Sequence, residues 1–225
     1  MARTVGLVDN DPFTLAALRS VLDDMSSCEV TWAVRSALEA FELCTQENTR
    51  PDLLVTDVSM PDMNGITLCR LIRSATPQVP ILAITSYNLD VYADQVAAAG
   101  AQGIVNKDDP MTISAAVAAV GSGAIWPYKS EQGDDKQPTV TFRTAPQAYG
   151  HVETSRAIQA IASLTAKELE VVRMTCETLE TFAELAEQLG CAESTVKTLA
   201  QRAYKKLGVS KRRELMDLWN QGLQS

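Results

Sequence analysis

The sequence predicts an α/β domain with a flavodoxin-like, five-stranded, doubly wound parallel sheet, followed by a small all-α helix-turn-helix domain. Three observations lead to this prediction. The chain has 225 residues, enough for two domains of ordinary size. Short runs rich in Val and Ile alternate with helical patterns over about the first 125 residues, which is typical of repeated βαβ units. From Leu164 onward the apolar pattern is helical only. We therefore expect domains at residues 1–126 and 161–225, joined by a linker at 127–160.

Each strand expected in the first domain is a short apolar run, and each helix is a stretch of about 10–14 residues between two runs. The expected strands are Thr4–Val8, Glu29–Ala33, Leu53–Thr56, Ile81–Ile84 and Gly103–Val105. The expected helices lie near residues 13–25, 36–46, 64–74, 89–99 and 110–121. In sheets of this kind, ligands bind at the carboxyl ends of the strands.

The region that follows differs in composition. Residues 127–150 contain three prolines, two glycines and no visible apolar period. This composition predicts a flexible or loosely packed linker.

The second domain shows helix start and stop signals. Capping-box signatures stand at Thr165–Glu168 and Thr181–Glu184. Gly190 is expected to end a short helix, and a longer basic helix is expected to run to about Lys206. A short helix, a tight turn and a longer basic helix predict a helix-turn-helix.

Charge and composition limit the function classes. Residues 1–126 hold 7 Lys+Arg against 15 Asp+Glu, whereas Glu193–Arg213 holds seven basic residues and one acid, which suggests different partners for the two domains. No apolar run approaches the roughly 18 residues needed to cross a membrane, and no signal peptide is visible, so we expect a cytoplasmic protein. Five cysteines without a CxxC pair, and a single histidine, argue against a disulfide framework, a zinc ribbon or a Ser-His-Asp triad.

Polar residues follow four of the expected strands. Asp9 and Asp11 follow the first strand, Asp57 the third, Thr85 the fourth and Lys107 the fifth. Clustered carboxylates suit a hard divalent cation, and a carboxylate beside such a cation can accept a phosphoryl group as an acyl phosphate. Lys107 would neutralise the phosphoryl oxygens and Thr85 would hydrogen-bond one of them.

These strand ends, with the stretch DVSMPDMNG around Asp57, resemble the receiver domain of bacterial two-component response regulators. The resemblance implies that Asp57 is the phosphoacceptor and that Met60-Pro61 and Gly65 shape the loop after it. It also implies a magnesium site and a phosphate-sensing switch. The implied magnesium ligands are Asp9, Asn10, Asp57 and the backbone carbonyl of Ser59, and the implied switch residues are Thr85, Lys107 and Ile104.

Two positions depart from this family. Asn10 stands where the family usually has a second acid that binds the metal, so one negative charge is lost and magnesium should bind more weakly. Ile104 stands where the family usually has Tyr or Phe. Because Ile has no ring, this position cannot report phosphorylation through the movement of a ring.

The stretch Leu164–Arg213 resembles the LuxR-type (NarL/FixJ) helix-turn-helix module, through LTAKELEVV, AELAEQLG, ESTVKTL and KKLGVSKRREL. It departs by one extra residue near Thr178–Thr181, by Leu199 in place of a common His, and by Ala192 where Ser or Thr usually caps the third helix. The missing cap should cost about 1 kcal/mol.

Apolar residues of the third helix recur at spacings of 4, 3 and 4, from Val196 through Ala200 and Ala203 to Leu207, and predict one buried stripe. Small polar and basic residues occupy the other faces, which fits binding in a DNA major groove. The expected DNA-binding residues are Ser194, Thr195, Lys197, Thr198, Gln201, Arg202, Lys205 and Lys206, with Lys211, Arg212 and Arg213 as further phosphate contacts.

Together these features predict a DNA-binding response regulator whose receiver is phosphorylated by a sensor histidine kinase. The partners implied are double-stranded DNA, the kinase, RNA polymerase and a second copy of the chain. The only chemistry implied is the gain and loss of the protein's own phosphoryl group, so we do not expect an enzyme.

Two alternatives fit parts of the sequence. Asn10 and Ile104 favour a constitutively dimeric transcription factor that works without phosphorylation. Asp9-Asn-Asp11 and Lys107 fit a phosphohydrolase of the haloacid dehalogenase type, although Thr14 lies one residue too late for that motif and DVSMPDMNG has no role in it.

Overall fold

The computed structural model describes residues 2–60, 63–128, 140–152, 156–178 and 180–224. The chain forms two compact units, Met1–Glu153 and Thr154–Ser225. Among the described residues, no helix combines the length and the apolar character needed to cross a bilayer.

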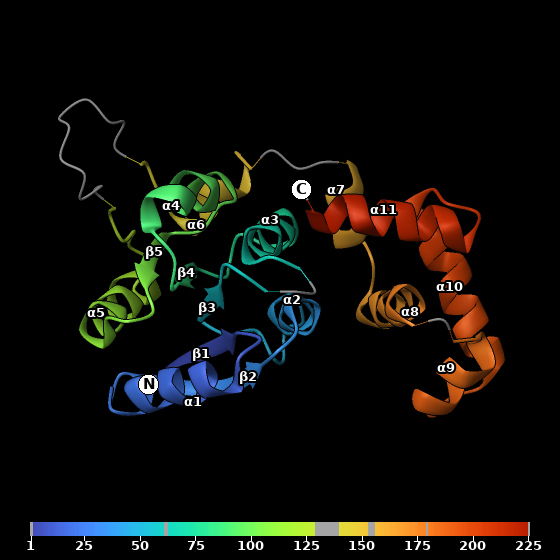
Figure 1. Cartoon of the computed structure of the whole chain (residues 1–225), viewed down its shortest axis with the longest axis horizontal. Coiled ribbons are helices and arrows are strands. Elements are labelled where there is room, and N and C mark those ends of the chain that lie inside the picture. Colours follow the sequence, from blue (N-terminus) through green and yellow to red (C-terminus); the bar gives the residue numbers. More distant parts are fainter. Residues whose placement is uncertain (1, 61–62, 129–139, 153–155, 179, 225) are drawn as a thin grey trace. The chain divides into compact units, whose positions relative to one another are not determined.

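The first unit contains the five-stranded parallel sheet predicted from the sequence (Figure 1). Its strand order is β2-β1-β3-β4-β5, and every neighbouring pair is parallel. The strands are β1 (Arg3–Val8), β2 (Cys28–Val34), β3 (Leu53–Asp57), β4 (Ile81–Thr85) and β5 (Gly103–Asn106). All residues of β3 and β4 are buried, as expected for central strands covered on both faces.

Helices cover both faces of this sheet, with α1 and α5 on one face and α2, α3 and α4 on the other (Figure 1). Their bounds are α1 (Pro12–Asp23), α2 (Ala37–Thr45), α3 (Gly65–Ala75), α4 (Leu89–Ala98) and α5 (Pro110–Gly121). Each lies within two residues of the predicted range. A side chain of the preceding residue caps the first turn of every one of these helices.

A buried arginine organises the amino-terminal pole of the sheet. Arg73 of α3 is 0% exposed, and its Nε donates to Gly100 O at 3.0 Å. Its terminal nitrogens donate to Thr76 O, Val79 O and the Oε1 of Gln102 at 3.1, 2.8 and 3.1 Å. Burial lowers the pKa of Arg73 to about 10. Neutral oxygens of two chain segments, residues 76–79 and 100–102, therefore hold this buried cation.

Gln102 joins this cluster to the chain that follows α5. Its Oε1 also accepts from Ile81 N at 2.8 Å, and its Nε2 donates to Arg143 O at 2.9 Å. Its backbone carbonyl accepts from Trp126 N at 2.8 Å. Gln102 thus holds the segment after α5 at two places, Trp126 through its backbone carbonyl and Arg143 through its side chain.

The expectation of a loosely packed linker is wrong for residues 140–152. Phe142 is 3% exposed, and α6 (Ala145–Tyr149) buries two alanines in the first unit. Thr144 N donates to the side chain of Gln147, and Pro146 lies in the first turn, where proline is tolerated. A single helical turn is too short to show an apolar period, so composition alone did not predict it.

The second unit is all-helical, as predicted. It consists of α7 (Arg156–Ala162), α8 (Ala166–Glu177), α9 (Phe182–Gln188), α10 (Glu193–Leu207) and α11 (Arg212–Gln224). Both predicted capping boxes are present, at Thr165–Glu168 and Thr181–Glu184. Gly190 and Gly208 follow α9 and α10 with positive φ angles of 60° and 68°.

Gln102→Leu should destabilise the first unit and loosen residues 140–152. Leucine fills a similar volume but leaves buried donors of Arg73 and Ile81 unsatisfied, and each such group costs roughly 1–3 kcal/mol. Urea unfolding of the full chain measures the loss, and hydrogen exchange measures the protection of residues 140–152. Gln95→Leu, on the exposed side of α4, is the matched control. Equal effects of the two substitutions would contradict this account of Gln102.

Candidate functional sites

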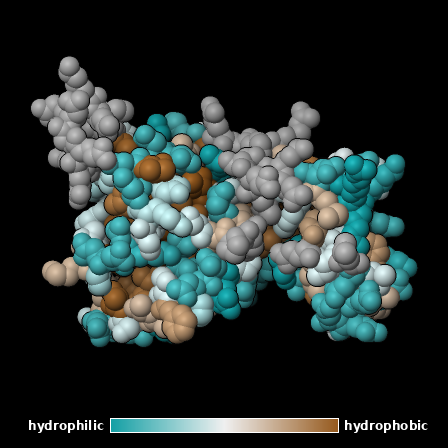
Figure 2. All heavy atoms as spheres, viewed as in Figure 1, coloured by the Kyte–Doolittle hydropathy of each residue, from teal (hydrophilic) through white to brown (hydrophobic). Residues whose placement is uncertain are grey.

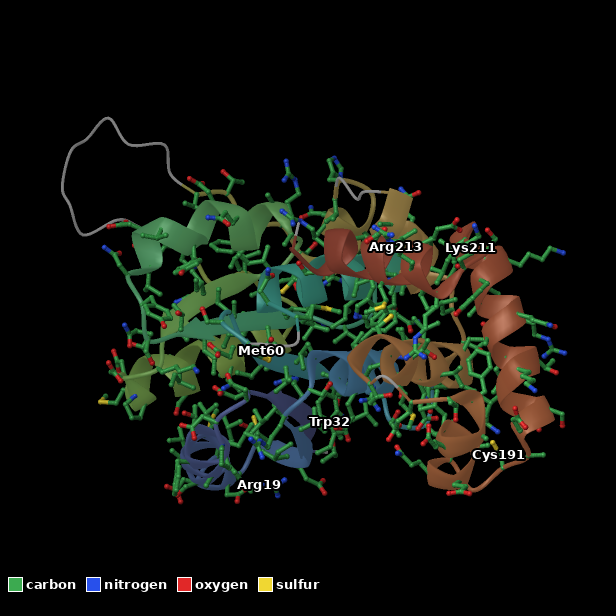
Figure 3. All side chains as sticks on the ribbon, turned by 45° about the vertical axis from the view of Figure 1, so that its right-hand side comes forward. Arg19, Trp32, Met60, Cys191, Lys211 and Arg213 are labelled. Atoms are coloured by element: carbon green, nitrogen blue, oxygen red, sulfur yellow. The ribbon has the colours of Figure 1, made fainter. Side chains whose placement is uncertain are left out.

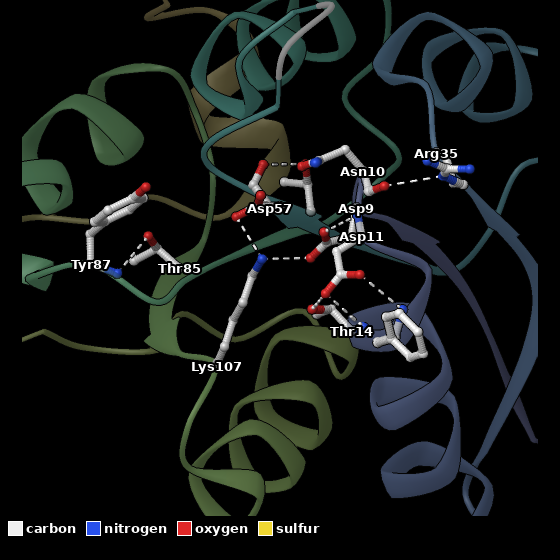
Figure 4. Close-up of polar contacts among 11 residues, drawn as sticks. Asp9, Asn10, Asp11, Thr14, Arg35, Asp57, Thr85, Tyr87 and Lys107 are labelled. Carbon is white, nitrogen blue, oxygen red and sulfur yellow. Dashed lines mark hydrogen bonds and ion pairs between the residues drawn. The ribbon is translucent and has the colours of Figure 1, made fainter.

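Three charged side chains meet at the carboxyl ends of β1, β3 and β5 (Figure 4). The Nζ of Lys107 lies 2.6 Å from Asp9 Oδ2 and 3.0 Å from Asp57 Oδ1. One ammonium group therefore bridges two carboxylates contributed by strands that are neighbours in the sheet.

Both carboxylates are buried, with Asp9 0% and Asp57 4% exposed. Burial raises the pKa of Asp57, because the charged form loses hydration. The hydrogen bond and the charge of Lys107, together with the backbone N–H of Ser59, act in the opposite direction. Lys107 is thus the main group that favours ionised Asp57.

The loop after Asp57 is closed by a glycine. Gly65 N donates to Val58 O at 2.9 Å, and a Cβ at residue 65 would lie 1.9 Å from the backbone oxygen of Asp57. A side chain at this position would displace the phosphoacceptor segment. Met60 of the same loop is buried, whereas Pro61 lies outside the described residues.

Asn10 and Asp11 have different environments. Asn10 is half-buried beside Asp9, and its backbone carbonyl accepts from Arg35 Nε at 3.1 Å. Asp11 is the N-cap of α1 and accepts from the N–H groups of Phe13 and Thr14. Sequence reasoning missed Arg35, although it follows directly after β2 as the other site residues follow their strands.

The oxygen donors fit a magnesium ion, with one acid fewer than receiver domains usually carry. Within the described part of the chain, no group of three or more Asp, Glu, His or Cys residues could hold a metal. Two carboxylates, Asp9 and Asp57, and the amide of Asn10 are near one another (Figure 4). Magnesium commonly binds through one or two carboxylates and keeps several waters, so this donor set is chemically suitable.

Two of the three predicted switch residues, Thr85 and Ile104, differ in their surroundings. Thr85 is 0% exposed at the end of β4, and its Oγ1 accepts from Tyr87 N at 3.1 Å. Its carbonyl accepts from Lys107 N at 2.9 Å. Ile104 is 1% exposed in β5, opposite Ala83 of β4.

In the second unit, α10 buries the predicted stripe of Val196, Ala200, Ala203 and Leu207. The surface over α10 and α11 is mainly hydrophilic (Figure 2). Lys211 and Arg213 extend near the start of α11, and Cys191 lies in the turn before α10 (Figure 3). All eight α10 residues expected at DNA are exposed: Ser194, Thr195, Lys197, Thr198, Gln201, Arg202, Lys205 and Lys206.

Two of the basic residues expected at phosphates are held within the domain. Lys206 Nζ lies 2.6 Å from Glu168 Oε2 and 3.2 Å from Ser163 O. The ammonium group of Lys206 is therefore bound to the start of α8, although the residue itself is exposed.

Arg212 is the second of these residues. Its guanidinium donates to the carbonyls of Thr175, Thr178 and Glu180, where α8 ends without a glycine. Carbonyls at the end of a helix lack the donors of a following turn, so Arg212 caps the end of α8 in place of a glycine turn. The expectation of a phosphate contact did not include this role.

Residues 5–118 match the family model described as "Response regulator receiver domain", and residues 162–219 match "Bacterial regulatory proteins, luxR family". The DNA-binding transcriptional activator DevR/DosR of Mycobacterium tuberculosis is 30% identical over 92% of this chain and 89% of its own length. The chain is a response regulator of the LuxR family.

Other relatives cover all or part of this response regulator. The transcriptional regulatory protein YxjL of Bacillus subtilis is 29% identical over 92% of this chain and 90% of its own. A solved LuxR-family response regulator from Aurantimonas is 28% identical, with a TM-score of 0.52 over 56% of this chain and 89% of its own. The structure of an RcsB–DNA complex, 23% identical with a TM-score of 0.51 over 98% of each chain, shares the fold.

The response regulator therefore combines a receiver with a LuxR-type DNA-binding domain, and its family consists of transcriptional regulators, not of classical enzymes. Neither alternative gains support from this site. The phosphohydrolase would use Asp11 as its acid/base, and here Asp11 is a helix cap.

Asp57→Asn should stabilise the metal-free response regulator at neutral pH, and the gain should shrink in acid. Because burial raises the pKa of Asp57, the folded state binds more protons than the unfolded state between the two pKa values, and wild-type stability falls as the pH rises through that window. The variant lacks this fall. Urea unfolding with a chelator, from about pH 4 to about pH 8, measures the difference. With exposed Asp23→Asn as control, a gain independent of pH would contradict the assignment.

Proposed function

We propose that this response regulator controls transcription through phosphorylation of Asp57, and that α10 reads the DNA sequence. The observation that carries the first part is the buried Asp9–Lys107–Asp57 cluster at the strand ends. In this cluster the ammonium group of Lys107 holds the Asp57 carboxylate and can also neutralise an incoming phosphoryl group.

In the proposed reaction, a carboxylate oxygen of Asp57 attacks the phosphorus of a phosphohistidine on a sensor kinase. The new O–P bond replaces the P–N bond of the donor, and the imidazole leaves with its electron pair and takes up a proton. Lys107 binds a phosphoryl oxygen, and Thr85 donates its hydroxyl to another. Hydrolysis of the acyl phosphate returns the carboxylate.

Magnesium would be held by Asp9, Asp57, the amide oxygen of Asn10 and the carbonyl of Ser59. When bound, it supplies positive charge that offsets the phosphoryl oxygens. Asn10 contributes an oxygen but no negative charge, so the site should bind magnesium more weakly than a site with three acids.

The DNA-facing surface is proposed to consist of the exposed residues of α10. Thr198 and Gln201 lie opposite the buried stripe, Thr198 in the amino-terminal half of α10 and Gln201 just past its midpoint. The amino-terminal part of such a helix usually contacts base edges. Arg202 and Lys205 make no ion pair within the described residues, which leaves them available for phosphates. Two copies binding together would read a two-fold related site, with RNA polymerase as the downstream partner.

The first experiment tests phosphorylation directly. The full chain is incubated with acetyl phosphate and magnesium and weighed intact by mass spectrometry. We expect a gain of one phosphoryl group in the wild type and none in Asp57→Asn. An unmodified wild type would favour the phosphorylation-independent alternative.

Asn10→Asp should tighten magnesium binding, because it adds a charged oxygen ligand. Titration of the full chain with magnesium, in wild type and variant, measures the change. Asn64→Asp, at the N-cap of α3, adds the same charge at another helix start and serves as the control. Equal magnesium affinities of wild type and Asn10→Asp would place Asn10 outside the metal shell.

Gln201→Ala and Lys205→Ala should affect DNA binding differently. Loss of a bidentate base contact costs about 1–3 kcal/mol for the cognate site only. Loss of a phosphate contact weakens all sequences alike and shallows the salt slope by about one unit. Competition between a cognate site and random DNA at several salt concentrations separates the two effects, with exposed Lys167→Ala of α8 as control. A reversed pattern would mean that α10 is rotated from the proposed orientation.

A further inference from the structure

Thr85 needs a second residue to report the state of Asp57. The resemblance places an aromatic ring at position 104, but Ile104 is 1% exposed within β5 and lacks a ring. An aliphatic side chain packed in the core has no exposed alternative position that would signal a change. A change at Asp57 must therefore be transmitted through another contact of Thr85.

The contact that the structure offers is Tyr87. Its backbone N–H donates to Thr85 Oγ1 at 3.1 Å, and the residue is 58% exposed. Its ring lies on the side of Thr85 away from Lys107 (Figure 4) and 6.2 Å from the ring of Tyr92, at an angle of 49°. An exposed aromatic side chain is thus bonded, through its own backbone, to the hydroxyl next to the phosphoacceptor.

Rotation of Thr85 would break this contact. The staggered positions of a threonine hydroxyl lie about 120° apart, so a hydroxyl that turns toward a phosphoryl group leaves the N–H of Tyr87. Only Ser86–Asn88 separates β4 from α4. The side chain of Asn88 caps α4 by accepting from Asp90 N at 2.9 Å. A shift of the Tyr87 backbone therefore displaces the first turn of α4, because Asp90 lies only three residues further along the chain.

The first turn of α4 holds the chain that leads to the second unit. The hydroxyl of Tyr128 donates to Asp90 Oδ1 at 2.7 Å. Tyr128 follows α5 by seven residues, and the same stretch is bonded through Trp126 N to Gln102 O. The Asp90–Tyr128 bond joins the loop next to Thr85 to the segment that follows α5 in the first unit.

We propose that Tyr87 and the Asp90–Tyr128 hydrogen bond carry the phosphorylation state of Asp57 to the segment that precedes the DNA-binding unit. We call this path from Thr85 through Tyr87 and Asp90 to Tyr128 the relay. Tyr87 is a positioning residue in it, and Tyr128 is its last residue before the segment that leads to the DNA-binding unit. The relay rests on the proposed function, since it transmits a phosphorylation event at Asp57.

The test compares the DNA affinity of the full chain with and without acetyl phosphate and magnesium, while intact mass reports the fraction phosphorylated. Coupling between sites typically changes an affinity by roughly 5- to 150-fold. We expect a ratio in this range for wild type and for Tyr87→Phe, which keeps the ring. We expect a ratio near one for Tyr87→Ala and for Tyr128→Phe, with unchanged phosphorylation. Exposed Tyr149→Ala and Tyr149→Phe are the matched controls.

Hydrogen exchange of residues 86–92 and 124–128 gives a second readout. Phosphorylation should change exchange in both peptides of the wild type, and in Tyr87→Ala the change at 124–128 should be lost. Tyr128→Phe removes a single hydroxyl, so it keeps the test valid if Tyr87→Ala lowers stability.

The outcomes separate the relay from the proposed function. A wild type that gains no phosphoryl group contradicts the proposed function. A phosphorylated wild type whose DNA affinity does not change contradicts the relay, as does an unchanged affinity ratio in both Tyr87→Ala and Tyr128→Phe.

Discussion

The bridge from Lys107 to two buried carboxylates is the interaction on which the receiver site depends. Asp9 and Asp57 stand at the ends of adjacent parallel strands, and their charges would repel at such short range without a cation between them. The ammonium group reduces that repulsion and also holds the end of β5 against β1 and β3. The same group is the cation that an incoming phosphoryl group would contact. The resting structure and the proposed chemistry therefore use one side chain.

At the opposite pole of the sheet, the amino-terminal ends of the strands, a second buried cation is also held by oxygen atoms. Arg73 is a buried cation held by neutral oxygens, and its partner Gln102 also binds the chain on both sides of residues 129–139. Burying a charge without a counterion is costly unless its hydrogen bonds are satisfied, and four hydrogen bonds hold this guanidinium. The fold of the receiver unit thus extends through residue 152, beyond its last large helix.

The sequence was sufficient for the fold because its signals are local and repeated. Alternating apolar runs predicted every strand of the sheet, and strand-end acids predicted that Asp9, Asp57 and Lys107 would meet. The missed features depend on contacts between distant residues. The short helix α6 has no period of its own, and the bonds from Arg35 to Asn10 and from Arg212 to the end of α8 join segments far apart in the chain. Basic composition near α10 could not distinguish Lys205 from Lys206, because only the fold places Glu168 beside the latter.

The two departures from the receiver pattern act on separate steps of the proposed cycle. Asn10 removes a charge next to Asp57, so it affects how well a metal and a phosphoryl group are held. Ile104 removes a ring from β5, so it affects how a phosphoryl group already present is sensed. The Thr85–Tyr87 contact bears only on sensing, because Tyr87 lies on the far side of Thr85 from the carboxylates. Weak phosphorylation and strong signalling can therefore coexist in one chain, and a substitution at position 10 should leave the Tyr87 relay intact.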